Sequence, residues 1–269
     1  MSATGAPPET LFHYTSAEGA LGILETGSVR ASMVHYMNDA RELHYALDLA
    51  QEQIFDTAHH SESYARDLCK EFVAAVQLIA IYAFSLSSQR DQLSQWRAYA
   101  GNGGYAIGIA RTLLEQVARS NDAMLVRCEY DVDKQRALLA PVVADMLSHA
   151  TVTQNDSHLG GLYEAFAERF VRAAASIKHP SFREEEEWRL ISGLGIDRAR
   201  VRYRTARGLV VPFTEWSLRI GGQYPIATVV VGPTLPGALA SRSLHHLTVA
   251  SFGWPVKVEF SESPLRSPG

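Results

Sequence analysis

The chain has 269 residues, of which 46% are hydrophobic and 20% are charged. This length and composition are typical of a folded globular domain and exclude a disordered or low-complexity chain. The formal net charge of −4 excludes a global positive field that would attract nucleic acid, so we expect no broad nucleic-acid-binding surface and only local contacts.

The chain has no window of eighteen apolar residues and no signal-like start, so we expect a cytoplasmic protein with no membrane partner. The two cysteines, Cys69 and Cys128, lie far apart without metal-ligand spacing. This pattern predicts a reducing compartment and no zinc site.

Apolar runs bounded by turn residues predict a series of short strands. In chain order, the expected strands cover residues 11–14, 29–32, 78–84, 105–109, 124–130, 187–192, 200–205, 209–213, 226–231 and 256–260. Helical periodicity predicts helices over residues 17–26, about 40–56, 64–76, 132–149, 160–177 and 236–247. Thr15 or Ser16 is suited to cap the first helix and Gly27 to end it.

The nearly unbroken apolar run over 78–84 indicates a central strand that is buried on both faces. Neither an internal repeat nor a linker divides the chain. We therefore expect one α+β domain over 10–266, with a split, mostly antiparallel central sheet and a helical insert at about 132–178. Residues 1–9 are small, polar and Pro-rich, and we expect this N-terminus to be flexible.

The first candidate site is His13-Tyr14-Thr15, at the end of the first expected strand. An imidazole in this position can donate a hydrogen bond to a ribose hydroxyl, and an adjacent aromatic ring offers a face for stacking. The alternative is a structural histidine at a strand end.

The second candidate site combines Trp96 and Tyr99 with a glycine turn over 101–104 and Tyr105. Glycines allow a ligand to approach the backbone closely, and the aromatic residues supply stacking surface. The turn lacks the Lys and Ser or Thr of a phosphate loop. A hairpin with core aromatic residues is the alternative.

The third candidate site is the acidic run over 184–187, which leads directly into an apolar strand. The strand period of two would place Glu185, Glu187 and Arg189 on one face. Paired carboxylates can hold a ribose hydroxyl and stabilise an oxocarbenium-like transition state, with Arg189 as the charge partner. A solvated acidic loop is the alternative.

Two weaker polar groups complete the candidates. Asn38 and Asp39, followed by Glu42, are most simply explained as a helix cap and a first-turn acid, although Asn38 remains a candidate nucleotide contact. Ser85 and Ser87 share one face of the central strand and can either line a cleft or satisfy a buried edge. We identify no metal-ligand pattern and therefore expect no metal.

Seven segments occur in an order that resembles a bacterial family known only as domain of unknown function 2971. They are LFHYTSAEGALGILETGSVRAS, HYMNDARE, AFSLSSQRDQLSQWRAYAGNGGYAIGI, HPSFREEEEWRLI, VPFTEW, VVVGPTL and SESPLR, spanning about residue 11 to residue 266. This resemblance implies a family but no activity.

A second, more distant resemblance implies a specific enzymatic activity. A strand carrying His-Tyr-Thr before a short helix and an L-x-x-G turn resembles the start of ADP-ribosyltransferases of the His-Tyr-Glu class. It implies that His13 holds the adenosine-side ribose of NAD, that Tyr105 or Tyr99 stacks on nicotinamide, and that Glu187 binds the nicotinamide ribose. Glu185 would then be the upstream glutamate of the E-x-E variant.

These observations together lead to a main hypothesis of an NAD-consuming ADP-ribosyltransferase that needs no metal. Its acceptor would be a protein, a nucleic acid or a small molecule. One alternative is a non-catalytic nucleotide-binding or interaction module of a bacterial defence or toxin system. The other is a metal-dependent phosphoesterase that uses Glu185, Glu187, His13 and Asp39.

Overall fold

The computed structural model describes residues 7–37, 40–57, 62–100, 103–152, 159–193, 196–206, 208–220 and 226–264. The strands are β1 (Thr10–Ser16), β2 (Ser28–Met33), β3 (Tyr82–Ser87), β4 (Gly104–Ala110), β5 (Ala123–Arg127), β6 (Glu187–Ser192), β7 (Arg202–Ala206), β8 (Leu209–Ser217), β9 (Ile226–Val231) and β10 (Lys257–Phe260). The α-helices are α1 (Ala17–Thr26), α2 (Ala40–Thr57), α3 (Glu62–Leu78), α4 (Leu93–Tyr99), α5 (Arg111–Ser120), α6 (Val132–Val152), α7 (Leu159–Ala174) and α8 (Gly237–Phe252). Short 3-10 helices are η1 (Val34–Tyr36), η2 (Pro180–Glu185) and η3 (Arg198–Arg200).

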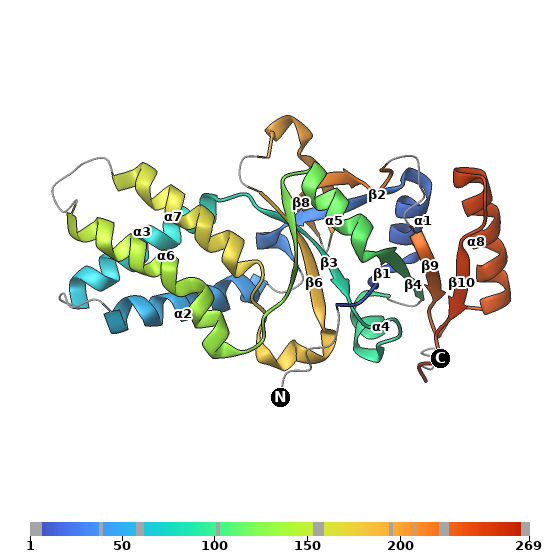
Figure 1. Cartoon of the computed structure of the whole chain (residues 1–269), viewed down its shortest axis with the longest axis horizontal. Coiled ribbons are helices and arrows are strands. Elements are labelled where there is room, and N and C mark those ends of the chain that lie inside the picture. The colour runs from blue at the N-terminus through green and yellow to red at the C-terminus, as the bar shows by residue number, and fades with distance from the viewer. Residues whose placement is uncertain are drawn as a thin grey trace.

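The described strands form one sheet in the order β10-β9-β4-β1-β3-β2-β8-β7, and β6 pairs with both β3 and β5 beside this path (Figure 1). The pairs between described strands are antiparallel except for β9 with β10. The expected α+β class and the mostly antiparallel sheet are therefore confirmed.

The sheet divides at β3. Along one side of β3, β6 pairs with every residue from Ala83 to Ser87. On the other side, β2 pairs only with Tyr82 and Ala83, whereas β1 reaches only Ser87. Because β1 and β2 diverge from opposite ends of β3, the sheet has a fork between them.

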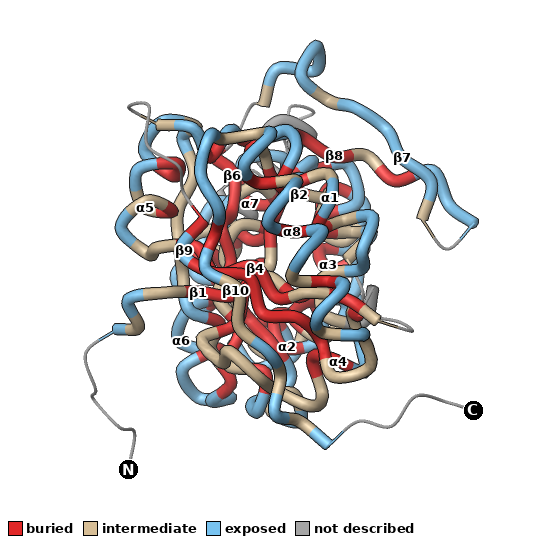
Figure 2. The backbone as a smooth tube through the Cα atoms, turned by 90° about the vertical axis from the view of Figure 1, so that its right-hand side faces the viewer, coloured by how far each residue is buried: buried red, intermediate tan, exposed pale blue. Residues whose placement is uncertain are grey.

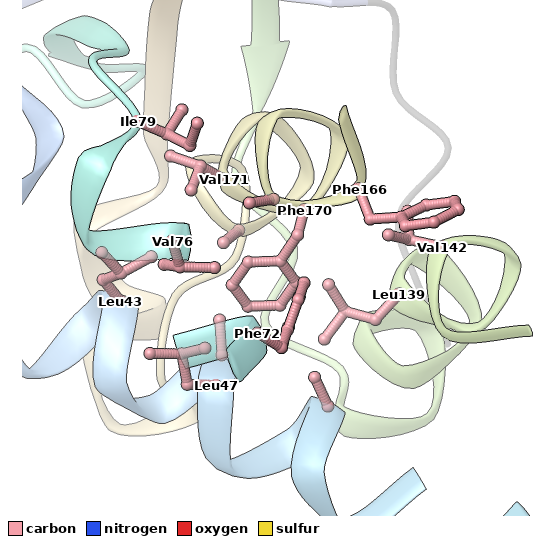
Figure 3. Close-up of a cluster of buried hydrophobic side chains, with 14 of the residues drawn as sticks. Leu43, Leu47, Phe72, Val76, Ile79, Leu139, Val142, Phe166, Phe170 and Val171 are labelled. Atoms are coloured by element: carbon pink, nitrogen blue, oxygen red, sulfur yellow. The ribbon is translucent and has the colours of Figure 1, made fainter. Parts of the chain in front are cut away.

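Four helices, α2, α3, α6 and α7, form a bundle at one end of the molecule (Figure 1). Its core contains the T-shaped pair Phe72 and Phe170, with ring centroids 5.1 Å apart, and the fully buried Leu139 (Figure 3). The helices expected as an insert, α6 and α7, thus pack against α2 and α3, which precede β3 in the chain. This end of the molecule is therefore built from two separate parts of the sequence.

Helices α1, α5 and α8 lie on the face of the sheet opposite the bundle core. Their buried apolar residues share one core with strands β1, β4 and β9. The strands are mostly buried and the outer faces of the helices are exposed (Figure 2). Ser16 caps α1 by accepting a hydrogen bond from the backbone N–H of Gly19, and Gly27 ends the helix with φ +63°. Both termini of this helix match the sequence-based expectation.

Two helices and one strand start were not expected from the sequence. The run over 78–84 begins in α3, so β3 starts only at Tyr82. Helices α4 and α5 were missed because Gln92 and Ala110, the residues before them, provide no side-chain cap. In the part of the chain described, no helix has both the length and the apolar character to cross a membrane.

Candidate functional site

A cleft of about 520 Å³ lies at the fork of the sheet. Its walls come from β1 and α1 on one side and from β2 and β7 on the other, with β3 between them and β6 contributing Glu187 and Arg189. The local reason is the divergence of β1 from β2, which leaves the middle of β3 without a strand partner on that side.

His13 lies in the fork. Its Nδ1 is 2.8 Å from the carbonyl oxygen of Ser85, and its ring lies against Phe84 with a centroid distance of 4.4 Å. A carbonyl oxygen only accepts, so Nδ1 carries the hydrogen. Burial lowers the pKa of the imidazole to about 4, against the opposing effect of the Ser85 hydrogen bond.

The neutral His13 ring therefore has one N–H, which is already donated to the backbone of β3. Its Nε2 is left as an acceptor. A ribose hydroxyl would thus donate to His13, which reverses the direction expected from the sequence.

Aromatic side chains line the cleft from several elements, namely Phe12, Tyr14, Tyr36, Phe84 and Tyr99. The hydroxyl of Tyr14 donates to the carbonyl oxygen of Gln89 and accepts from the N–H of Gln92. These bonds fix the loop after β3, and they commit the Tyr14 hydroxyl to a structural role.

Glu187 is the first residue of β6 and is almost fully buried. Its two carboxylate oxygens accept from Nε and Nη2 of Arg189 at 2.7 and 3.0 Å, and one of them also contacts Nζ of Lys178. Burial alone would raise the pKa of this carboxyl, but the charges of Arg189 and Lys178 outweigh burial and lower it to about 2. Glu187 is therefore held ionised at neutral pH.

Glu185 lies at the end of η2 rather than on the strand, because Glu186 between them adopts a left-handed conformation with φ +42°. The expectation that Glu185 and Glu187 share one face of a strand is therefore wrong, because only Glu187 belongs to β6. Their carboxylates nevertheless converge on Lys178, whose Nζ lies 2.7 Å from Glu185. Burial raises the pKa of Glu185 despite the nearby Lys178 charge.

Glu42 of α2 completes this group by contacting Nζ of Lys178 at 3.3 Å and Nη2 of Arg189 at 2.5 Å. We call Glu42, Lys178, Glu185, Glu187 and Arg189 the charged cluster. Three carboxylates face two cations, so the group has a formal charge of −1. A buried group of this kind is stable only while every charge keeps its partners.

The wall formed by α1 carries two residues without side chains. Gly19 and Gly22 of this helix line the cleft, and a Cβ atom added at Gly22 would meet open space. A ligand can therefore approach the α1 backbone closely at this position.

The cleft gathers most of the residues proposed from the sequence, namely His13, Tyr14, Thr15, Ser85, Tyr99, Glu185, Glu187 and Arg189. Trp96 and Tyr105 do not line it. Trp96 is fully buried, donates from Nε1 to Asp91 at 2.6 Å and packs edge-on against Tyr14. Tyr105 packs into the core covered by α1, α5 and α8, on the face of the sheet that also carries His13, and Asn38 and Asp39 lie outside the described residues.

The sequence did not predict the site roles of two residues of the charged cluster. Lys178 was not considered, although a lysine at the end of an apolar helix and just before an acidic run needs a carboxylate partner once buried. Glu42 was treated only as a first-turn acid. Within the described ranges, no group of three or more His, Cys, Asp or Glu side chains is arranged to hold a metal ion.

A comparison with known families matches part of the chain. The model of a family described as a protein of unknown function (DUF2971) matches residues 95–190. This match supports the DUF2971 assignment over about a third of the chain, a shorter span than the resemblance noted in the sequence. It includes Lys178, Glu185, Glu187 and Arg189 but not His13. No curated protein and no solved structure matches the chain significantly.

Proposed function

We propose that the cleft binds NAD and that the protein transfers ADP-ribose from it to an acceptor. The observation that carries this proposal is that His13 and Glu187, 174 positions apart in the sequence, line one cleft at the fork of the sheet. The strand register places His13 and Glu187 on opposite faces of the sheet. The cleft therefore offers a neutral imidazole acceptor on one face and an ionised carboxylate on the other, and a dinucleotide has a ribose for each.

The reaction breaks the bond between nicotinamide nitrogen and C1 of its ribose. Nicotinamide leaves with the bonding electron pair, and the ribose acquires oxocarbenium character. A lone pair of the acceptor then forms the new bond to C1, and the acceptor loses its proton to solvent or to a carboxylate. No net oxidation or reduction takes place.

The chain's own residues suit the charge that develops in this reaction. The lowered pKa of Glu187 keeps its carboxylate negative, and Arg189 and Lys178 hold it in place. A preorganised negative group beside a developing cation stabilises the transition state without reorganisation.

The aromatic lining supports a stacking role for nicotinamide, and Tyr99 is the residue that fits this role among the two tyrosines considered from the sequence. Tyr99 lines the cleft from the end of α4, whereas Tyr105 packs into the core covered by α1, α5 and α8 and is not among the cleft-lining residues. Glu185 lies beside Glu187 through their shared contact with Lys178, which supports a role for Glu185 in orienting the acceptor.

One observation favours a second candidate function, a nucleotide-binding module without turnover. Both carboxylate oxygens of Glu187 already accept hydrogen bonds from Arg189 and Lys178. A clamped carboxylate of this kind can hold a nucleotide-bound conformation together without contacting the ribose. Such a module would bind NAD and release no nicotinamide.

The test is nicotinamide release from NAD, measured by chromatography for the parent protein and Glu187→Gln. We expect slow release by the parent and a loss of about 10²-fold or more in the variant, because removing one preorganised electrostatic contact has effects of that size. NAD affinity, measured by calorimetry, should change little.

Arg127→Gln is the matched control, since this exposed residue of β5 lies outside the cleft. NAD binding without release by the parent would favour the non-catalytic module. Release at the parent rate by Glu187→Gln would remove Glu187 from the mechanism, and absence of NAD binding would contradict both candidates. Circular dichroism and thermal unfolding establish that the variant is folded before its activity is compared.

A further inference from the structure

A basic hairpin lies at the edge of the sheet next to the cleft. We call residues 196–206 and 208–213 the arginine hairpin; it comprises η3, β7 and the first half of β8. It contains Arg198, Arg200, Arg202 and Arg204, all exposed, in seven consecutive residues. Figure 2 shows β7 and this part of β8 projecting from the body of the molecule with a largely exposed surface.

The positive charge of the arginine hairpin is only weakly compensated. Asp197 uses its carboxylate to cap η3 by accepting from the N–H of Ala199. Glu215 lies 4.0 Å from Arg202 and also pairs with Arg30 of β2. The described part of the hairpin therefore presents a local excess of positive charge on a chain whose overall charge is negative.

The arginine hairpin is continuous with the cleft. Arg204 and Thr205 line the cleft together with Arg30, and Nη2 of Arg204 donates to Oγ of Ser32. Arg204 is exposed as a whole, but the partial burial of its guanidinium group and the nearby Arg30 charge lower its pKa. An arginine nevertheless remains charged at neutral pH. Two neighbouring guanidinium groups that line the cleft favour the binding of an anion there.

The opposite face of the same strand carries an aromatic ring. Tyr203 alternates with Arg202 and Arg204 along β7, and 67% of its surface is exposed. Because β7 is the last strand on its side of the described sheet, its outer edge is not covered by another described strand. A linear polymer lying along this edge can therefore contact guanidinium groups on one side and the tyrosine ring on the other.

We propose that the arginine hairpin binds single-stranded nucleic acid and leads it towards the cleft. Arginine forks match phosphate oxygens, and an exposed tyrosine supplies a stacking surface for a base. An acidic polypeptide would use the arginines but gain little from the aromatic ring, so the combination favours nucleic acid. The proposal concerns binding alone and is independent of NAD turnover.

The experiment is fluorescence anisotropy of labelled 20-nucleotide single strands, poly-dT and poly-U, with the full-length protein in the absence of NAD. The test variant is Arg200→Ala/Arg202→Ala, which leaves the cleft-lining Arg204 and Arg30 unchanged. The matched control, Arg119→Ala/Arg242→Ala, makes the same charge change at exposed positions of α5 and α8. We expect about tenfold weaker binding for the test variant, a shallower salt dependence by about 1.4 in the log–log slope, and parent-like binding for the control.

Substitutions of Tyr203 distinguish nucleic acid from other polyanions as the ligand of the arginine hairpin. Tyr203→Ala should weaken binding about fivefold or more because a stacked base is lost, and Tyr203→Phe should restore it. Equal weakening by the two arginine pairs, or no binding of either oligonucleotide at low salt, would overturn the proposal. Poly-glutamate that competes as well as poly-dT would instead identify an acidic polypeptide as the partner. Tyr203→Ala with parent affinity would exclude base stacking and overturn the assignment to nucleic acid.

Discussion

The bundle core and the charged cluster lie on the same face of the sheet and share two elements. Helix α2 contributes Leu47 to the bundle core and Glu42 to the charged cluster, and β6 contributes Ile191 and Arg189 in the same way. Apolar side chains fill the bundle core, whereas five charges surround one another next to the cleft. Burial of apolar surface stabilises the fold directly, but a buried ion cluster roughly balances its desolvation cost and is a weak source of stability.

The comparison indicates which region serves the fold and which serves the site. Replacing the whole charged cluster by apolar residues would leave these positions equally buried but uncharged. Because the charges contribute little to stability, we infer that they serve ligand binding or chemistry in the cleft. The following predictions test this difference between the bundle core and the charged cluster.

The largest destabilisation is expected from breaking the charged cluster. Arg189→Met removes the main partner of Glu187 and one of two partners of Glu42. These buried carboxylates would keep Lys178 as their one remaining cationic partner in the charged cluster. Breaking the cluster in this way should lower the free energy of unfolding by about 3–5 kcal/mol, as measured by urea denaturation. Arg169→Met is the control, because its pair with Asp145 is exposed and should contribute at most about 1 kcal/mol. Equal effects of the two substitutions would show that the charged cluster is no more sensitive than the surface.

A similar or smaller loss of stability is expected from a substitution in the bundle core. Leu139→Ala removes a fully buried side chain packed between helices and should destabilise the protein by about 2–5 kcal/mol. NAD affinity per folded molecule should remain unchanged, because Leu139 lies outside the cleft. A loss of NAD affinity that persists after correction for the unfolded fraction would contradict the separation of the two regions.

The pH dependence of stability should report the burial of His13. Its pKa falls from 6.5 to about 4 on folding, so between these values the unfolded chain binds a proton that the folded chain does not. Stability from this group is fully present above pH 6.5 and is lost as the pH falls towards 4, with a slope of at most about 1.4 kcal/mol per pH unit. His13→Gln should remove this slope in urea titrations between pH 4 and 7. An unchanged slope would show that His13 titrates normally in the folded protein.

The smallest effect on stability is expected at Gly22, in the α1 wall of the cleft, where a substitution should strongly reduce NAD binding. The Cβ atom of Gly22→Leu would meet open space, and the substitution removes a glycine from the middle of α1, so the free energy of unfolding should change by about 1 kcal/mol or less. The added side chain should nevertheless block NAD binding in calorimetry. Glu25→Leu is the control, because this residue of the same helix is exposed and lies outside the cleft. Normal NAD binding by Gly22→Leu would place the ligand elsewhere.

The bundle and the strands were largely predictable from the sequence, because their apolar periodicity is set by local burial. The helix over Ala17–Thr26 and the strand over Glu187–Ser192 match their expected bounds. The charged cluster was only partly predictable. Glu187 and its Arg189 partner are two residues apart on one strand, whereas Glu42 and Lys178 reach them from distant segments through tertiary packing. The left-handed turn at Glu186, which changes the direction of the Glu185 side chain, has no local signature because glutamate rarely adopts positive φ.

A crystal structure of the protein with NAD tests the central claim most directly. The account predicts that the dinucleotide occupies the cleft at the fork of β3, with a ribose hydroxyl donating to Nε2 of His13 and the nicotinamide ribose next to Glu187. Density for NAD at any other place on the molecule, or within the cleft but out of reach of both side chains, would contradict it.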